Sequence, residues 1–191
     1  MANSKIEQAM KRQGYGAAEI ADAINKAVVE MLDTLKDEKN ICFLHSTGKY
    51  GKWVEDKLRE MNIEFGGGTN IHIREYIDNM DVCLPACDIV ISRAGASSIS
   101  EIQALNKPSI LIPSPNVAEN HQFYNAKALA DNGAAVIIEE KDLTGEKLIE
   151  TVASLIDDKE KLQSMSDAAL KMAVTDSNER IYKVIMNLLK K

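Results

Sequence analysis

Residues 88–101 combine residue types that together could bind a phosphate group. An apolar run, Ile-Val-Ile at 89–91, is typical of a strand buried on both faces, and small residues follow it at 93–96. Ser97 and Ser98 then offer N-cap hydroxyls at the start of a predicted helix. A strand that enters a helix through a small-residue turn directs unpaired backbone N–H groups and the positive end of the helix dipole at one spot. Such a spot suits a phosphate.

Glu101 lies one helical turn further on, where its carboxylate could face the same ligand. A carboxylate there can accept hydrogen bonds from both hydroxyls of a ribose, so the stretch indicates a sugar nucleotide. The alternative is an ordinary capped helix, in which Ser98 and Glu101 form a capping box. Both interpretations stay open on this stretch alone.

Apolar runs that alternate with amphipathic segments predict the elements that position these residues. The pattern predicts an α/β protein with a Rossmann-like, doubly wound parallel sheet, because strands alternate with helices. Polar loops follow the predicted strands at 45–51, 74–79, 93–98 and 114–122, and such loops converge on a crevice beyond the carboxyl ends of the strands. The strands are expected at 41–44, 71–73, 89–91, 107–113 and 134–138, and three closing helices at 142–157, 159–173 and 177–190.

Composition and charge narrow the class of protein. The net charge of −6 and the pI near 5.2 argue against nucleic acid as the main partner, since no basic surplus exists to neutralise phosphates. No apolar run approaches the length of a membrane span, no signal peptide opens the chain, and no amphipathic basic helix is expected. The cysteines Cys42, Cys83 and Cys87 are expected in the core, without metal spacing around them. An odd number of buried thiols indicates a reducing cytoplasm.

Several motifs in register resemble one family. The residues at 92–101, 107–115 and 118–126, with matches in order at 45–49 and 76–80, are similar to the donor-binding half of the MurG transferases of glycosyltransferase family 28. This family adds N-acetylglucosamine (GlcNAc) to undecaprenyl-pyrophosphoryl-N-acetylmuramoyl-pentapeptide and so completes lipid II. The resemblance covers roughly residues 24–189. It implies one half of a GT-B fold, inversion at the anomeric carbon, no cofactor and no required metal.

The resemblance also implies how the nucleotide part of UDP-GlcNAc is bound. The backbone at Ile77 would hold the uracil, the helix N-terminus at 96–98 would hold the diphosphate, and Glu101 would bind the ribose hydroxyls. A site without metal must stabilise the leaving diphosphate with the helix dipole and backbone donors.

Side chains of the later motif would recognise the sugar. His121 and Gln122 would contact the hydroxyls of the GlcNAc ring with Asn125 in support, and Arg93 would brace the loop; amide and imidazole groups suit such hydroxyls. The complete set of residues expected at the donor site is Ile77, Arg93, Gly95, Ala96, Ser97, Ser98, Glu101, His121, Gln122 and Asn125.

The sequence departs from the family pattern at its start. The family's donor half normally opens with a strand and a Gly-Gly-Ser turn that touches the diphosphate, whereas residues 13–25 here match only at Gly16 and at Ile24-Asn25. We therefore expect an atypical helical segment over residues 1–23, in place of the first strand, and a donor-binding domain with closing helices over residues 24–191. One phosphate contact is thereby in doubt.

The acceptor half of the family, with its candidate general base, has no counterpart in the sequence, so no catalytic residue is assigned. The leading hypothesis is a UDP-GlcNAc-binding half that needs an acceptor domain or subunit in order to transfer the sugar. Alternatives are the donor subunit of a split two-chain UDP-GlcNAc transferase, or a non-catalytic or engineered fragment that retains only the fold. The chain is expected in the cytoplasm, and the whole enzyme at the inner face of the cell membrane.

Overall fold

The computed structural model describes residues 17–189. The expectation for residues 1–16 lies outside this range, and the rest of the predicted N-terminal segment belongs to a long helix. The boundary expected between the N-terminal segment (1–23) and the donor-binding domain (24–191) falls inside this helix. It stays a prediction. The helices are α2 (Ala17–Leu35), α3 (Trp53–Glu60), α4 (Met80–Ala86), α5 (Ala96–Ala104), α6 (His121–Asp131), α7 (Gly145–Ile156), α8 (Lys159–Met172) and α9 (Ser177–Leu189).

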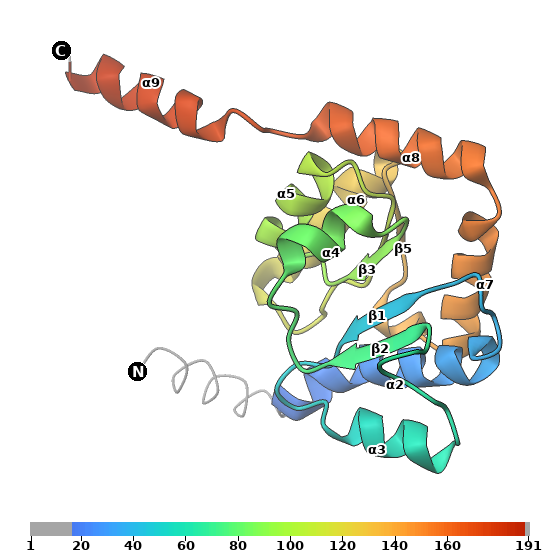
Figure 1. Ribbon diagram of the computed structural model, residues 1–191. Coiled ribbons are helices and arrows are strands. Elements are labelled where there is room, and N and C mark those ends of the chain that lie inside the picture. The colour runs from blue at the N-terminus through green and yellow to red at the C-terminus, as the bar shows by residue number, and fades with distance from the viewer. Residues whose placement is uncertain (1–16, 190–191) are drawn as a thin grey trace. The chain divides into compact units, whose positions relative to one another are not determined.

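All five predicted strands form, and every pair is parallel (Figure 1). They divide into two sheets, β1-β2 and β3-β4-β5, so the α/β prediction is confirmed while the single continuous sheet is not. The strands are β1 (Phe43–Ser46), β2 (Ile71–Arg74), β3 (Val90–Ser92), β4 (Ser109–Leu111) and β5 (Ala135–Ile137).

The absence of a strand within residues 17–42 agrees with the division into two sheets. In the usual doubly wound order 3-2-1-4-5-6, the first strand pairs with both the second and the fourth. The two sheets here correspond to the 3-2 and 4-5-6 parts of that order. Residues 17–42 contain no strand, so β1 and β3 each keep one edge without a strand partner in the described part of the chain.

The described residues form two compact units. The first contains the chain up to Asp81 together with Ile138–Asp157, and the second contains Val82–Ile137 together with the chain from Asp158 onward. In the first unit, α2 packs on α3 and α7, with Leu32, Leu58 and Leu148 fully buried. The carboxylate of Glu30 accepts a hydrogen bond from the first N–H of α7, at Gly145, over 2.7 Å.

The second unit is built around β4, whose three residues are all buried. Helix α6 packs on the neighbouring strand β5, and α5 packs on α6 and α8. Ala94, Ile102, Leu111 and Ala126 form the middle of this core. The chain therefore holds the β3–α5 and β4–α6 connections on a rigid apolar base.

One expectation about side-chain environment is wrong. Cys42, expected in the core, is exposed because it lies just before β1 rather than inside it. Cys83 lies in α4, which has no buried residue, and Cys83 and Cys87 are both only half-buried. Helix α9 carries Ile, Val and Leu side chains that are exposed along one face. This amphipathic helix follows an extended segment after α8 (Figure 1).

Candidate functional site

The candidate site lies in the second unit, at the carboxyl ends of β3 and β4. Strand β3 passes through residues 93–95 into α5, and β4 passes through residues 112–120 into α6. Because β3 and β4 are parallel neighbours, both connections leave the same edge of the sheet. All the predicted site residues except Ile77 belong to these two connections or to the helices that follow them.

The N-terminus of α5 presents open backbone donors. Its N-cap is Gly95, no side chain caps it, and the first intrahelical hydrogen bond runs from Ile99 N to Gly95 O over 2.9 Å. The N–H groups of Ala96, Ser97 and Ser98 therefore have no intrahelical acceptor. The side chains of Ala96 and Ser97 are exposed, so these donors and the helix dipole face an accessible surface.

This N-cap overturns the capping-box interpretation. Ser98 is the third residue of α5 rather than its cap, so it cannot pair with Glu101 in a capping box. Glu101 is exposed, one turn into the helix, and is available to a ligand.

Gly95 leaves space above the turn. Its φ of −68° is open to any residue, so the backbone conformation does not require glycine. A Cβ built there would meet only Ser98 Oγ, at 3.8 Å, which is ordinary contact. The protein's own packing therefore does not require glycine, and its small size suits the close approach of a ligand to the backbone.

Two side chains hold the β3–α5 connection in place. Arg93 Nη1 donates to Ile112 O over 3.3 Å, and Asn125 Nδ2 donates to Ala94 O over 3.1 Å. Ala94 itself is completely buried. The Asn125 amide, expected beside the sugar, thus fixes the loop from α6, while the Arg93 contact is bracing of the kind that the family resemblance assigns to it.

The β4–α6 connection orients His121 and Gln122. His121 Nδ1 donates to Ala118 O over 2.9 Å, because a carbonyl oxygen can only accept, and the exposed ring keeps Nε2 as a hydrogen-bond acceptor. Gln122 Oε1 accepts from Ser114 N over 3.0 Å, which leaves its amide N–H groups as donors. Glu119 and Asn120 before the helix have φ of 54° and 51°, a conformation that costs free energy in non-glycine residues and often occurs at functional sites.

Ile77 belongs to the first unit, on the loop after β2, and its side chain is buried there.

The first unit also holds a polar cluster around His45 that the sequence analysis missed. His45 Nε2 donates to Asn25 Oδ1 over 2.8 Å, and Asn25 Nδ2 donates to Thr47 O over 3.1 Å. Burial lowers the pKa of His45 from 6.5 to about 4, so the ring is neutral at pH 7.

The cluster is tightly packed and lies at the carboxyl end of β1. A Cβ at Gly51 would approach Thr47 Cβ to 2.4 Å and Asn25 Nδ2 to 2.9 Å, so only glycine fits there. One signal was available in the sequence: Asn25 lies three and four residues before the buried Val28 and Val29, on an otherwise apolar helix face.

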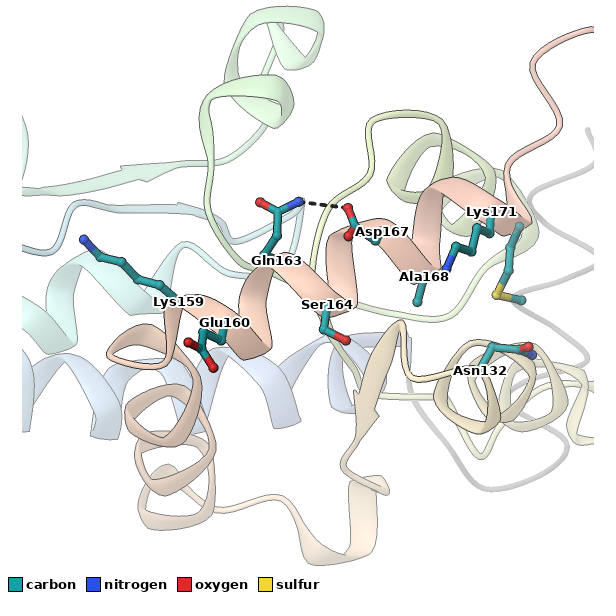
Figure 2. Close-up of a pocket in the computed structure, with 9 residues that line it drawn as sticks. Asn132, Lys159, Glu160, Gln163, Ser164, Asp167, Ala168 and Lys171 are labelled. Carbon is teal, nitrogen blue, oxygen red and sulfur yellow. Dashed lines mark hydrogen bonds between the residues drawn. The ribbon is translucent and has the colours of Figure 1, made fainter.

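A hollow elsewhere in the second unit is a weaker candidate (Figure 2). It lies along α8 beside Asn132, and its side chains carry both signs of charge, with Gln163 Nε2 donating to Asp167 Oδ1 over 2.8 Å. Asn132 precedes β5, so the hollow lies toward the amino end of that strand, away from the loops described above. Ligands of open α/β sheets bind at the carboxyl ends.

The arrangement at β3 and β4 supplies binding groups of three kinds. Backbone donors and a helix dipole suit a phosphate, the Glu101 carboxylate suits paired hydroxyls, and an imidazole with an amide suits further hydroxyls.

Within residues 17–189, no group of three His, Cys, Asp or Glu side chains is placed to hold a metal ion. No helix in this range has the length and apolar composition needed to cross a membrane.

Comparison with known proteins identifies the family. The model of the glycosyltransferase family 28 C-terminal domain matches residues 16–181. The chain is 39% identical over 176 residues to the UDP-N-acetylglucosamine--N-acetylmuramyl-(pentapeptide) pyrophosphoryl-undecaprenol N-acetylglucosamine transferase of Desulforamulus reducens, covering 92% of this chain and 47% of the relative. It is 40% identical over 177 residues to the transferase of the same name from Bacillus cytotoxicus, covering 93% of this chain and 48% of the relative.

A solved structure gives the same result for the fold. The crystal structure of MurG from Acinetobacter baumannii superposes with a TM-score of 0.72 at 24% identity, over 87% of this chain and 46% of the MurG chain. The chain thus spans about half the length of the relatives that it matches and has the Rossmann-like architecture of a GT-B half. It belongs to the glycosyltransferase family 28 C-terminal domain family, as the residues at 92–101 and 118–126 predict.

Proposed function

We propose that this chain is the UDP-GlcNAc-binding half of a MurG-type inverting N-acetylglucosaminyltransferase of peptidoglycan synthesis. The observation that carries the proposal is the open N-terminus of α5, where Gly95 caps the helix and residues 96–98 present N–H groups without intrahelical acceptors. In a chain of this family, at the carboxyl end of β3, these donors have the chemistry to bind a sugar-nucleotide diphosphate.

The proposed chemistry needs no metal ion. As the bond between the sugar and the diphosphate breaks, negative charge grows on the diphosphate, and the N–H groups and dipole of α5 stabilise it. Glu101 accepts hydrogen bonds from both ribose hydroxyls, and the backbone at Ile77 holds the uracil. His121 Nε2 accepts from one hydroxyl of the GlcNAc ring, and the Gln122 amide donates to another.

We further propose that transfer needs an acceptor domain. Transfer requires an acceptor hydroxyl held against the anomeric carbon and a base within hydrogen-bond reach of it. In the proposed site, Glu101 is committed to ribose, and His121 and Gln122 to the sugar. The relatives are about twice as long as the aligned part, and we assign both missing functions to their remaining half. We expect this chain in the cytoplasm and the complete enzyme at the inner face of the cell membrane.

A second candidate is the donor subunit of a split transferase, whose partner chain supplies the acceptor half. It differs from the leading proposal only in how the acceptor half is linked, and both predict the same donor site.

NMR titration of the chain with UDP-GlcNAc tests the donor site directly. Backbone shift changes are expected to cluster at residues 93–101 and 119–125, because these segments follow β3 and β4. We also expect changes at residues 74–79, because the family resemblance assigns the uracil to the backbone at Ile77. A titration with GlcNAc alone is the matched control and is expected to leave residues 93–101 unchanged. Changes confined to residues 141–191 would contradict the proposed site.

A further inference from the structure

The polar cluster in the first unit is a directed chain of hydrogen bonds that the proposed chemistry does not use. A carbonyl oxygen can only accept, so Asn25 Nδ2 is the donor to Thr47 O, over 3.1 Å. This turns Asn25 Oδ1 toward the imidazole, where His45 Nε2–H donates to it over 2.8 Å. Asn25 and Thr47 are 3% and 6% exposed. The ring of His45 therefore fixes the amide of Asn25, and the amide fixes the backbone at Thr47.

The backbone at Thr47 in turn holds the start of the loop after β2. Thr47 N donates to Arg74 O over 2.9 Å, and Gly48 N donates to Glu75 O over 3.0 Å. Two consecutive carbonyl groups at the start of the loop at 74–79 are thus bound by the turn that the cluster fixes. The hydrogen bonds lead without a break from the imidazole ring to this loop.

The turn after β1 has little freedom to move on its own. A Cβ at Gly51 would lie 2.4 Å from Thr47 Cβ and 2.9 Å from Asn25 Nδ2, so the chain passes directly against the cluster. Gly51 N also donates to Gly48 O over 3.0 Å, and Ser46 Oγ adds a second donor to the Glu75 carbonyl at 3.1 Å. A change in the cluster is therefore transmitted to the loop instead of being absorbed by the turn.

A loop backbone that is held still can distinguish one pyrimidine from another. Uracil presents an acceptor at O4 and a donor at N3–H, whereas cytosine presents a donor at its amino group and an acceptor at N3. A backbone N–H and C=O that pair with the first pattern oppose the second, provided that both groups keep their positions.

We propose that His45 and Asn25 are positioning residues for base recognition, which hold the loop at 74–79 so that its backbone selects uracil. The inference rests on the proposed function, because it deepens the specificity of the donor site at Ile77. Neither side chain touches the nucleotide in this account. Both act through the backbone of Thr47 and Gly48.

The test compares variants of the full chain that break or keep the hydrogen bonds. His45→Leu removes the ring donor, and Asn25→Asp keeps the shape and the acceptor but loses the donor to Thr47 O. His45→Gln retains an N–H that can donate to Asn25 Oδ1 and should rescue the function. His72→Leu is the matched control, since it makes the same exchange at a half-buried histidine of the neighbouring strand β2.

Amide hydrogen exchange of the ligand-free protein measures the hold on the loop. We expect the amides of Thr47 and Gly48 to exchange at least about tenfold faster in His45→Leu and Asn25→Asp, and within about twofold of the wild type in His45→Gln and His72→Leu. The amide of Ile63, which donates to Leu58 O over 2.9 Å elsewhere in the unit, reports any general loss of stability. Unchanged exchange of the two amides in both breaking variants would overturn the proposal.

NMR titration with UDP and with CDP measures the selection of the base. Both ligands are followed at residues 93–101, because they share the diphosphate and the ribose. The wild type, His45→Gln and His72→Leu are expected to bind UDP at least about tenfold more tightly than CDP, and His45→Leu and Asn25→Asp by no more than about threefold. A loss of folded protein weakens both apparent affinities by the same factor, so the ratio reports on the loop.

The ratio of the two affinities also separates this inference from the proposed function. A wild type that binds UDP and CDP equally, or a His45→Leu variant that keeps the full preference for UDP, would overturn the positioning role and leave the donor site standing. Absence of UDP binding in the wild type would refute the proposed function and the selection of uracil together. The exchange of Thr47 and Gly48 would then still show whether the cluster holds the loop.

Discussion

The buried imidazole of His45 makes the stability of the protein depend on pH in a defined direction. In the folded protein, burial lowers the pKa of His45 from 6.5 to about 4, and its Nε2–H donates to Asn25. Above pH 7 the ring is neutral in both the folded and the unfolded states, so it contributes no pH dependence. Between pH 6.5 and pH 4 the unfolded chain binds a proton that the folded chain does not bind, so stability is lost as the pH falls through this window.

The size of the loss follows from the two pKa values. Each pKa unit corresponds to about 1.4 kcal/mol, so the full window from 6.5 to about 4 is worth about 3 kcal/mol, most of which is lost by about pH 4.5. The substitution His45→Gln removes the titrating group and retains an amide that can donate to Asn25 Oδ1. Urea unfolding at pH 7.5 and 4.5 measures the free energy of unfolding of both proteins.

The wild type is expected to lose about 2–3 kcal/mol more than His45→Gln between these pH values. Carboxylates titrate in both proteins, so their contribution cancels in the comparison. An equal loss of stability in the two proteins would refute the reasoning, because it would mean that the ring is protonated as readily in the folded chain as in the unfolded chain.

Three further predictions concern the donor site. Glu101→Ala should weaken UDP binding by roughly 1–3 kcal/mol in calorimetry and leave the thermal midpoint unchanged, because the side chain is exposed and is not part of a cap. Gly95→Ala should also keep the thermal midpoint, since the added Cβ meets only Ser98 Oγ, yet weaken UDP binding about tenfold by obstructing the approach to the backbone; unchanged binding would place the diphosphate elsewhere. The chain alone should transfer no radiolabelled GlcNAc to a lipid I analogue, and label in the lipid fraction would show that it contains an acceptor site.

Local periodicity was sufficient to predict the elements. The short apolar runs gave all five strands within a few residues, and Gly133, with φ of 74°, ends α6 as predicted. The start of α5 was misjudged because hydroxyl residues favour N-caps, while the helix begins at Ala96 behind a glycine. A turn of small residues permits several start points, and only the tertiary structure selects one.

Contacts between distant segments were beyond the reach of sequence patterns. The hydrogen bond of His45 to Asn25 joins residues 20 apart, and that of Asn125 to Ala94 joins residues 31 apart. The division into two sheets depends on a strand that residues 17–42 do not provide. For α9, the apolar spacing predicts a face that needs cover, but it does not say which surface covers it.

Calorimetric titration with UDP-GlcNAc, UDP and UDP-glucose tests the central claim most directly. We expect saturable binding of UDP-GlcNAc at one site with a Kd on the order of 0.1–1 mM, weaker than micromolar because one phosphate-binding turn of the family is altered here. UDP should bind through the same diphosphate and ribose contacts, and UDP-glucose should bind more weakly than UDP-GlcNAc. The absence of saturable heat with both UDP-GlcNAc and UDP at concentrations of about 10 mM, well above that Kd, would contradict the claim that this chain is a donor-binding domain.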